Sequence, residues 1–293
     1  MLWQQVLLLV GVLACSASPI FIKASHVHPI VMAAVRLLMA CAILAPLFFR
    51  DWRRHRAVYT REHLRRTHAP AVVLALHLMS WSWGARLTIT VQASLIVNLA
   101  PIAIPFFLHS IVGEKINRTE VFGTILAVIG VLVLTARDAF TGGGDVWGNC
   151  VCFGSMLLFA WYLALGRKHR DFPTIWLYVV PIYLQAGLLC LILSTPWITS
   201  SLVGAPAREW LLLLGLACVP TILGHSLLNQ AMRHFRGQIV SLCNVGQFVF
   251  SGIAAYFIFH EQPAPLFYVS SAIVVTGIAL VVFSAPTAPP RLR

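Results

Sequence analysis

The sequence has 293 residues, of which 59% are hydrophobic and only 10% are charged. Soluble proteins carry about 25% charged residues, so this composition and a mean hydropathy of +0.84 exclude a water-soluble surface and indicate an integral membrane protein. The formal net charge of +12 would suggest nucleic-acid binding in a soluble protein, but here each loop has to be considered separately.

A helix needs about 20 apolar residues to cross the hydrocarbon core of a bilayer. The apolar stretches are continuous and lack the alternation of barrel strands, so the sequence predicts an all-α integral membrane protein. Ten spans are predicted, at 2–22, 29–49, 69–87, 90–111, 119–136, 146–166, 174–195, 209–228, 238–259 and 265–284.

The first span could instead be a signal peptide, and Val12, Leu13, Ala14 and Cys15 loosely resemble a lipoprotein cleavage site. However, a signal peptide requires Lys or Arg ahead of its apolar stretch, and none precedes this one. Nine further spans also follow. We therefore predict that 2–22 is a transmembrane helix.

The distribution of Lys and Arg predicts the orientation. With a cytoplasmic N-terminus, the loops after even-numbered spans and the C-terminal tail hold 16 of them, seven between Arg50 and Arg66, whereas the other side holds four. We expect a multi-pass protein of the inner (plasma) membrane with both termini cytoplasmic. Its basic loops should contact anionic lipid headgroups and not nucleic acid.

An internal repeat relates the two halves of the chain. Residues 94–133 match 241–280 at a constant offset of 147, and a weaker register at offset 144 pairs Trp3 with Trp147. The halves, predicted as 1–140 and 141–293, then hold five spans each, and because five is odd they must be inverted in the membrane. Inverted repeats are typical of transporters with a mid-membrane substrate site, although a duplicated structural protein could also contain one. The matched turns carry Glu114, expected on the cytoplasmic side, and Glu261, expected outside.

Several motifs follow one another in an order that resembles the drug/metabolite transporter superfamily, EamA type. They comprise Ser18, Pro19, Lys23, Pro29 and Arg36; Trp83, Gly84, Ala85, Ala93, Ser94 and Pro101; Gly113, Glu114 and Gly130; Ala160, Trp161, Tyr162, Gly166, Arg167 and Lys168; and His260, Glu261 and Gly277. The resemblance implies a ten-helix carrier of two inverted five-helix repeats, more often an exporter than an importer, but names no substrate. Phe248 departs from it, because the family usually has proline there, so a kink in the ninth helix is in doubt.

Arg36 lies about seven residues into the second span, where a charge costs about 2.5–3.5 kcal/mol unless it is solvated or paired. It could attract an anionic group of the substrate. It could equally be structural, by snorkelling or by binding helix-end carbonyls.

Polar residues at spacings of three and four form stripes on four spans, and lipid contact would be costly for them. Cavity lining and helix–helix hydrogen bonding are both open for each residue. Aromatic side chains could add walls for amphipathic or cationic ligands. The predicted substrate cavity comprises Arg36, His77, Trp81, Asn98, Trp161, Tyr162, His225, Asn229, Asn244 and Gln247, and the predicted points of helix flexing are Gly84, Pro101 and Pro105.

No Asp or Glu lies at the centre of a predicted span. Proton coupling would therefore need His77 or His225, and uncoupled or exchange transport is slightly favoured. The seven cysteines fall within spans without C-x-x-C spacing, the histidines of the loops lack a metal-ligand pattern, and no P-loop or serine-protease motif occurs. We expect no enzyme activity, no metal and no cofactor.

The sequence thus predicts a secondary transporter that exports a small amino-acid-like, drug-like or organic-anion metabolite by alternating access through a central cavity, as a monomer or homodimer. The alternative is a non-transporting membrane scaffold or assembly protein.

Overall fold

The computed structural model describes residues 2–88, 93, 96–140, 146–247, 249–250 and 265–283, which form helices and turns without strands. Each of the ten predicted spans contains at least one helix. The helices are α1 (Leu2–Ser16), α2 (Ser18–Ala24), α3 (Pro29–Arg54), α4 (Arg61–Arg66), α5 (His68–Leu87), α7 (Ala100–Val112), α8 (Arg118–Phe140), α9 (Val146–Lys168), α10 (Trp176–Leu202), α11 (Ala207–Leu216), η1 (Ala217–His225), α12 (Ser226–His234), α13 (Gly237–Val245) and α15 (Pro265–Phe283).

Several helices are longer than their apolar stretches. Within the described ranges, five are long and apolar enough to cross a bilayer: Leu2–Ala24, Pro29–Arg54, Val146–Lys168, Trp176–Leu202 and Ala207–His234. α3 continues past the predicted end at 49 to Arg54, because the basic residues of its last turn suit the negative end of the helix dipole. For α3, apolar length therefore underestimates helix length.

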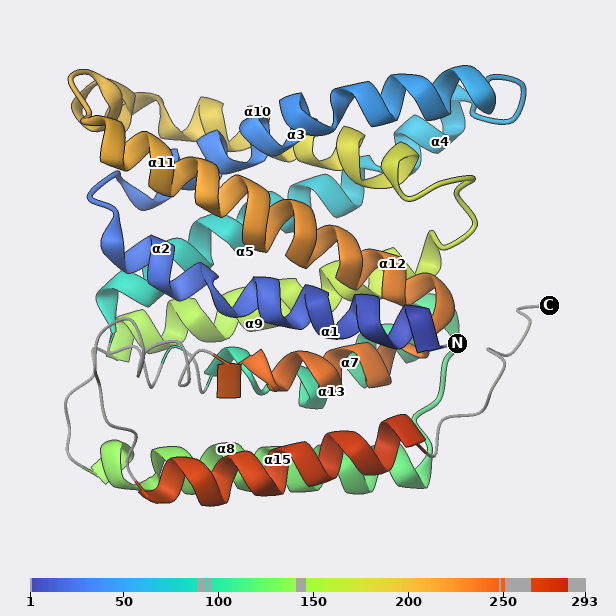
Figure 1. The fold of residues 1–293 in the computed structure, drawn as a ribbon, viewed down its shortest axis with the longest axis vertical. Helices are drawn as coiled ribbons and strands as arrows, with labels where there is room; N and C mark the ends of the chain where they lie inside the picture. Colours follow the sequence, from blue (N-terminus) through green and yellow to red (C-terminus); the bar gives the residue numbers. More distant parts are fainter. Residues whose placement is uncertain are drawn as a thin grey trace.

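Equivalent helices of the two halves pack against each other. α3 lies along α10, α8 along α15 and α7 along α13, and the members of each pair run in opposite directions (Figure 1). α5 packs on α9, and α1 packs correspondingly on η1 and α12. Exchanging the halves preserves these pairs, so the ten-helix inverted repeat is confirmed. The predicted boundary at 140/141 adjoins residues 141–145, which lie outside the described ranges.

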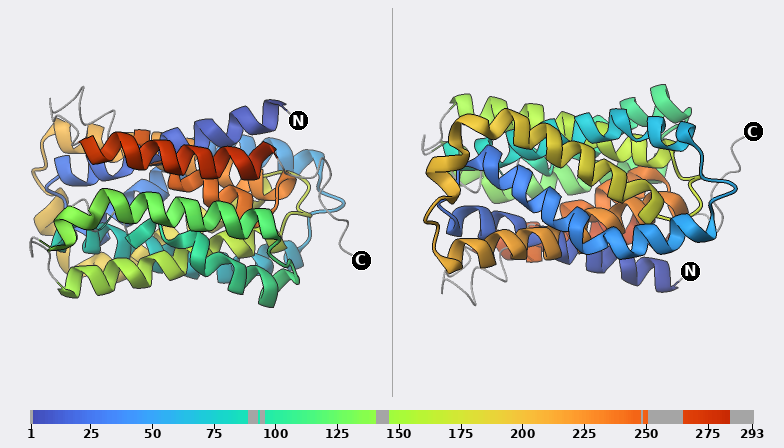
Figure 2. Two further views of the ribbon diagram at one scale, coloured as in Figure 1. Left: turned by 90° about the horizontal axis from the view of Figure 1, so that it is seen from below. Right: turned by 90° about the horizontal axis from the view of Figure 1, so that it is seen from above.

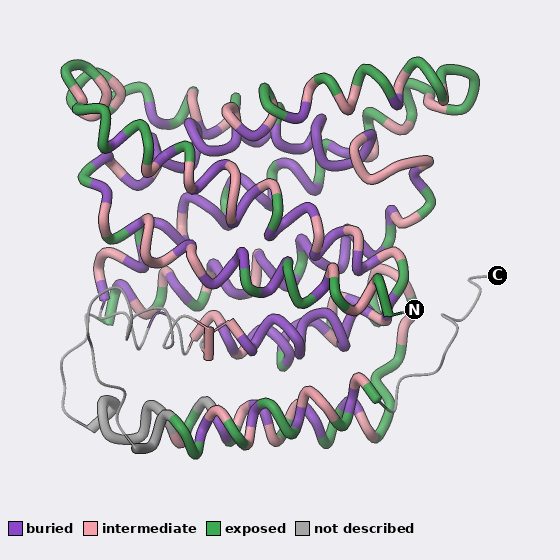
Figure 3. Tube along the Cα trace, in the orientation of Figure 1, coloured by how far each residue is buried: buried purple, intermediate pink, exposed green. Residues whose placement is uncertain are grey.

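All helices run roughly along one common direction (Figures 1 and 2). We call the end that holds α4 and the segments 113–117, 169–175 and 235–236 the basic end; the opposite end holds 25–28 and 203–206. Buried residues concentrate on the inner helices, whereas exposed positions follow the outer faces (Figure 3). Large apolar side chains such as Phe106, Ile192 and Leu211 are exposed there, as lipid contact requires.

Two glycines, one on each helix, allow α5 and α9 to approach closely. A Cβ on Gly84 of α5 would lie 2.7 Å from the Cys152 sulfur of α9, and one on Gly148 would lie 2.8 Å from the Leu87 Cβ. The structure thus places Gly84, a predicted point of helix flexing, at a tight crossing of α5 and α9. Flexing at Gly84 stays a prediction.

Two irregular helices meet at the centre of the molecule. The first span breaks after Ser16, and Pro19, which has no N–H to donate, stands in the first turn of α2. Opposite it, η1 is a π-helix that contains Pro220. A Cβ on Gly224 would lie 2.5 Å from the Cys15 sulfur, so the two irregular segments are in direct contact. Such backbone is tolerated at membrane depth where it lines a cavity or is covered by protein.

Candidate functional site: a central cavity and the ion pairs of the basic end

A small cavity of about 40 Å³ lies where the halves meet, among α1, α2, α5, α9, η1 and α13. One water needs roughly 10–15 Å³ by this measure, so the cavity has room for a few waters and not for a metabolite. Its lining combines apolar walls with imidazole and amide groups, from Cys15, Ser18, Pro19, His77, Leu78, Trp81, Val97, Phe159, Pro220, His225, Asn244 and Gln247.

His77 is held rigidly in the cavity wall. Its Nδ1 lies 3.0 Å from the Ser155 carbonyl oxygen and 2.9 Å from the Ser155 hydroxyl, and its ring stacks on Phe159 with centroids 4.9 Å apart. A carbonyl only accepts, so this geometry assigns the hydrogen to Nδ1 and leaves Nε2 as an acceptor. The His225 ring lies 6.1 Å from the His77 ring. The cavity therefore has two neighbouring imidazoles.

Arg36 is fully buried behind the cavity wall formed by η1. Its Nε donates to the Thr221 hydroxyl at 2.9 Å, and that hydroxyl donates to the Leu216 carbonyl. The Tyr183 hydroxyl bonds the Thr221 carbonyl and the Ser226 hydroxyl at 3.1 and 3.0 Å. The π-helix backbone is thus tied to α3 and α10. The two Nη atoms of Arg36 have no hydrogen-bond partner among the described residues.

A hydrogen bond between Tyr162 and Asn229 joins α9 to α12 next to the cavity. The Asn229 amide nitrogen donates to the Tyr162 hydroxyl at 2.7 Å and to the His225 carbonyl at 2.8 Å. A Cβ on Gly166 would lie 2.4 Å from the Asn229 side-chain oxygen, so glycine is needed for this approach. These contacts give Asn229 a role in helix–helix bonding, one step away from the cavity surface.

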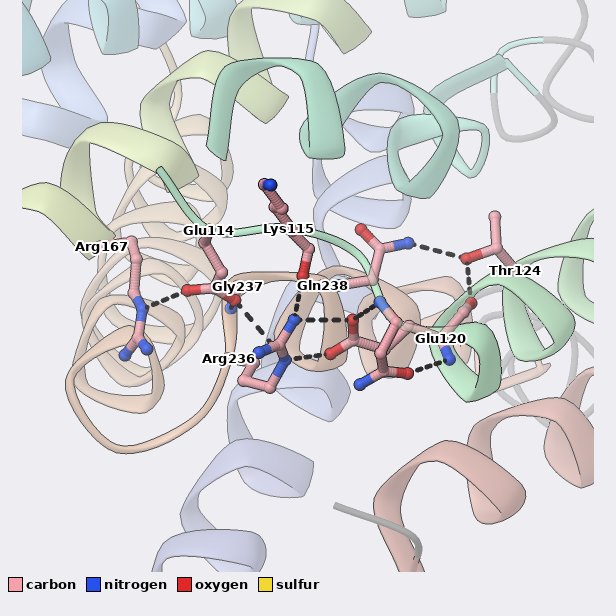
Figure 4. Close-up of polar contacts among 9 residues, drawn as sticks. Glu114, Lys115, Glu120, Thr124, Arg167, Arg236, Gly237 and Gln238 are labelled. Carbon is pink, nitrogen blue, oxygen red and sulfur yellow. Dashed lines mark hydrogen bonds and ion pairs between the residues drawn. The ribbon is translucent and has the colours of Figure 1, made fainter. Parts of the chain in front are cut away.

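A short left-handed turn directs Glu114 into the protein at the basic end. Gly113 ends α7 with a φ of 72°, and the N–H groups of Gly113 and Glu114 donate back to the carbonyls of His109 and Leu108. This is a Schellman-type cap, in which glycine suits the left-handed position. The Glu114 carboxylate then accepts from Arg167 Nε at 2.9 Å and from the Gly237 N–H at 3.0 Å (Figure 4).

Glu120 and Arg236 complete a neutral cluster, which we call the basic-end network: Glu114, Glu120, Arg167 and Arg236. Glu120 forms a reciprocal capping pair with Asn117 at the start of α8, and it also accepts from both Arg236 Nε and Nη2. Arg167 further donates to the Met232 carbonyl at 2.9 Å. The network joins α7, α8, α9, α12 and α13 at the basic end (Figure 4).

The burial of Arg167 corrects one part of the charge count. The predicted sixth span ends at 166, so the count treated Arg167 as a loop residue. Arg167 belongs to α9 and is only 1% exposed. A charge count cannot reveal this, because it shows neither where a helix ends nor which acid lies beside it. The sequence feature that could have indicated this buried ion pair is Glu114, an acidic residue close to an apolar span.

A larger cleft of about 400 Å³ opens at the opposite end, between α2 and α5. Its lining is basic and includes Lys23, His26 and Arg86. Arg86 donates to the Ser25 carbonyl at 2.6 Å, and the Glu209 carboxylate nearby accepts from the Ser25 hydroxyl and the His26 N–H. Because α2 and α5 also line the central cavity, the cleft lies toward one end of the same helix pair.

Comparison with known proteins identifies the family. Residues 2–136 and 146–283 each match the model of the EamA-like transporter family. The chain belongs to this family. One solved structure, described only as "Crystal structure of protein", is similar with a TM-score of 0.77 and 16% identity, covering 96% of this chain and 97% of that chain. At this identity the likeness shows the fold alone. No curated protein matches the chain.

In this EamA-like chain, half of the predicted cavity residues lie at the cavity: His77, Trp81, His225, Asn244 and Gln247. Arg36, Tyr162 and Asn229 lie behind its walls, and Asn98 is buried in the turn before α7. Trp161 lies elsewhere: it is 39% exposed and stacks on Phe107 at an outer face, because successive residues of a helix face different sides.

Both prolines predicted as points of helix flexing lie in α7. Pro101 stands in the first turn of α7 and not within a continuous 90–111 helix, and its carbonyl accepts from Gln238 at 2.9 Å. Pro105 lies inside α7. Glu261 and Phe248 lie outside the described residues. Within the described ranges, no three His, Cys, Asp or Glu side chains come together as a metal site.

Proposed function

We propose that this chain, which as a member of the EamA-like family is a multi-pass membrane transporter of the drug/metabolite type, exports a small polar or amphipathic metabolite. Transport would proceed by alternating access, in which the inverted halves rock about the central cavity. One observation carries the proposal: the cavity lies between the halves, and the ion pairs of the basic-end network join the helices of both halves at one end of the molecule.

The size of the cavity supports the need for a conformational change. About 40 Å³ is far below the roughly 300–1,000 Å³ of ligand-binding pockets. Substrate entry from the basic end would require the ion pairs of Glu114 and Glu120 to separate. Release at the opposite end would lead through the basic cleft between α2 and α5.

The charge distribution supports an inner-membrane location with the basic end and both termini in the cytoplasm. It also supports contact of the 50–66 segment with anionic lipid headgroups. We further propose uncoupled or exchange transport, because the acids of the described residues lie in loops or near helix ends, such as Asp51 in the last turns of α3 and Glu209 in the first turn of α11.

Counterflow in vesicles tests the proposal. Purified protein in sealed vesicles, preloaded with members of a panel of amino acids, drugs and organic anions, should accelerate uptake of the labelled compound, and an imposed proton gradient should not drive it. Trp81→Ala should reduce uptake several-fold because Trp81 lines the cavity. Trp83→Ala is the matched control, since Trp83 on the same helix is 45% exposed. No counterflow of any compound by folded protein would favour the scaffold alternative.

A further inference from the structure

Arg36 differs from the other buried and half-buried arginines in how its charge is compensated. Arg167 and Arg236 pair with carboxylates, and Arg86 donates to backbone carbonyls. Arg36, in contrast, is fully buried with a single neutral partner, the Thr221 hydroxyl, and no partner for either Nη among the described residues. An uncompensated buried cation is costly and marks a functional site in a membrane protein.

The groups that face Arg36 supply no protein counter-charge. The titratable side chains within electrostatic range of Arg36 are Cys15 of α1, His77 of α5, Tyr183 and Cys190 of α10, and His225 of η1, whereas α11, which also packs on α3, contributes none. No carboxylate is among them, and none of the described acids forms an ion pair with Arg36. The compensating anion therefore has to come from outside the described part of the protein.

We propose that Arg36 is the counter-charge for a carboxylate group of the transported molecule. This inference rests on the proposed function and names its substrate class. A guanidinium presents a planar pair of donors that matches a carboxylate in a two-pronged geometry, and here both Nη atoms are available while Nε is fixed on Thr221.

The position of the cavity allows this pairing. Cys15, Pro220 and His225 line the cavity, and the Arg36 partner Thr221 directly follows Pro220. The wall between cavity and guanidinium thus consists of the π-helix and the break between α1 and α2, the two irregular segments. Rearrangement of either would bring the Nη atoms to a carboxylate in the cavity, while Asn244 and Gln247 contact the rest of the molecule.

The basic cleft at the opposite end points independently to an anion. Lys23, His26 and Arg86 line it, and it lies between the same two helices that carry Ser18 and Trp81 to the cavity. A cleft lined by one sign of charge concentrates ligands of the other sign. The nearby acid, Glu209, is engaged by Ser25, His26 and Arg208.

Paired probes test the proposal in vesicles: benzoate with benzamide, succinate with succinamide, and L-alanine with L-alaninamide. For at least one pair, the wild type should transport the carboxylate with a KM roughly tenfold or more below that of its amide. Arg36→Gln should bring the two KM values together, and Arg36→Lys should keep the order with a smaller ratio. Amide transport that Arg36→Gln leaves unchanged, without any preference for a carboxylate, would overturn the proposal and leave transport standing.

A second measurement needs neither transport nor a stable Arg36→Gln protein. Cys15 lines the cavity, so its alkylation in detergent-solubilised wild type, quantified by mass spectrometry, should slow several-fold with the carboxylates and not with the amides. Arg36→Lys should weaken this protection. Protection without vesicle transport would support the anion site and contradict the proposed function. Equal protection by inorganic phosphate would assign the site to inorganic anions and overturn the substrate class, as would equal protection by carboxylates and amides.

Discussion

At the scale of single residues, the basic-end network illustrates how burial changes the meaning of a charge. Arg167 and Arg236 contribute to the positive-inside pattern of the sequence, yet each is engaged by a carboxylate that a glycine-capped turn or a capping pair directs inward. Two acids and two arginines balance, so the network is neutral as a unit. Removal of one member leaves an unpaired buried charge, which typically costs about 3–5 kcal/mol.

Glu114→Gln should therefore favour opening of the basic end. The change leaves Arg167 unpaired, so we expect a lower unfolding temperature in detergent and greater water access to thiol reporters around Lys115. Glu62→Gln is the matched control, because Glu62 pairs with Arg65 at 3.8 Å on an exposed surface, where ion pairs contribute about 0–1 kcal/mol. Equal effects of the two variants would contradict a special role for Glu114. Glu114→Gln with Arg167→Gln should recover part of the loss.

His169, in the segment after α9, should make stability depend on pH. Burial and then the nearby Arg66 and Lys168 lower its pKa from 6.5 to about 4, and the Arg66 guanidinium donates to its Nδ1. The fold thus favours the neutral ring: this contribution is complete above pH 6.5 and is lost as the pH falls toward 4, by at most about 3 kcal/mol. His169→Gln, which keeps an acceptor but does not titrate, should flatten the thermal-stability profile over this window. Parallel profiles would contradict the assignment.

At the scale of helices, close crossings depend on glycine. Gly84→Ala should lower the unfolding temperature, because the new methyl would meet the Cys152 sulfur and backbone of α9, and overpacking typically costs about 1–3 kcal/mol. Gly154→Ala is the control, since nothing lies within 4 Å of a Cβ there, and alanine is the better helix former. If Gly84→Ala instead reduced transport at unchanged stability, the sequence-based interpretation of Gly84 as a flexing point would be favoured.

Span number, all-α class and inverted repeat could be predicted from sequence, because apolar length and internal similarity are one-dimensional properties. His77, Trp81 and His225 could be predicted as cavity residues because polar stripes must avoid lipid. The π-helix at 217–225 could not be predicted from the sequence. Pro220 indicates that the helix is disturbed there, but it does not indicate which hydrogen-bond pattern the backbone adopts. The partners of Arg167 could not be predicted either, because pairing across 53 residues depends on tertiary packing.

At the scale of the whole molecule, the inverted repeat leaves one question that packing alone does not answer, namely which end faces the cytoplasm. The helix pairs are related by exchange of the halves, so the arrangement of helices looks nearly the same from either end. Charge breaks this symmetry: 16 Lys and Arg are assigned to the basic end, and the segment 50–66 alone supplies seven of them. The orientation therefore depends on the charged ends of the chain's helices and loops, and not on the packing of the helices.

Thiol labelling of single cysteines tests this orientation. In a variant whose seven native cysteines are replaced, Val58→Cys places a reporter at an exposed site of the basic end, and Val203→Cys places one at an exposed site of the opposite end. An impermeant maleimide added to intact cells should label the reporter at 203 and reach the one at 58 only after permeabilisation, because the Lys and Arg excess keeps its side cytoplasmic. The reverse pattern would make the basic end external. The network of Glu114, Glu120, Arg167 and Arg236 would then lie at the outer side of the membrane.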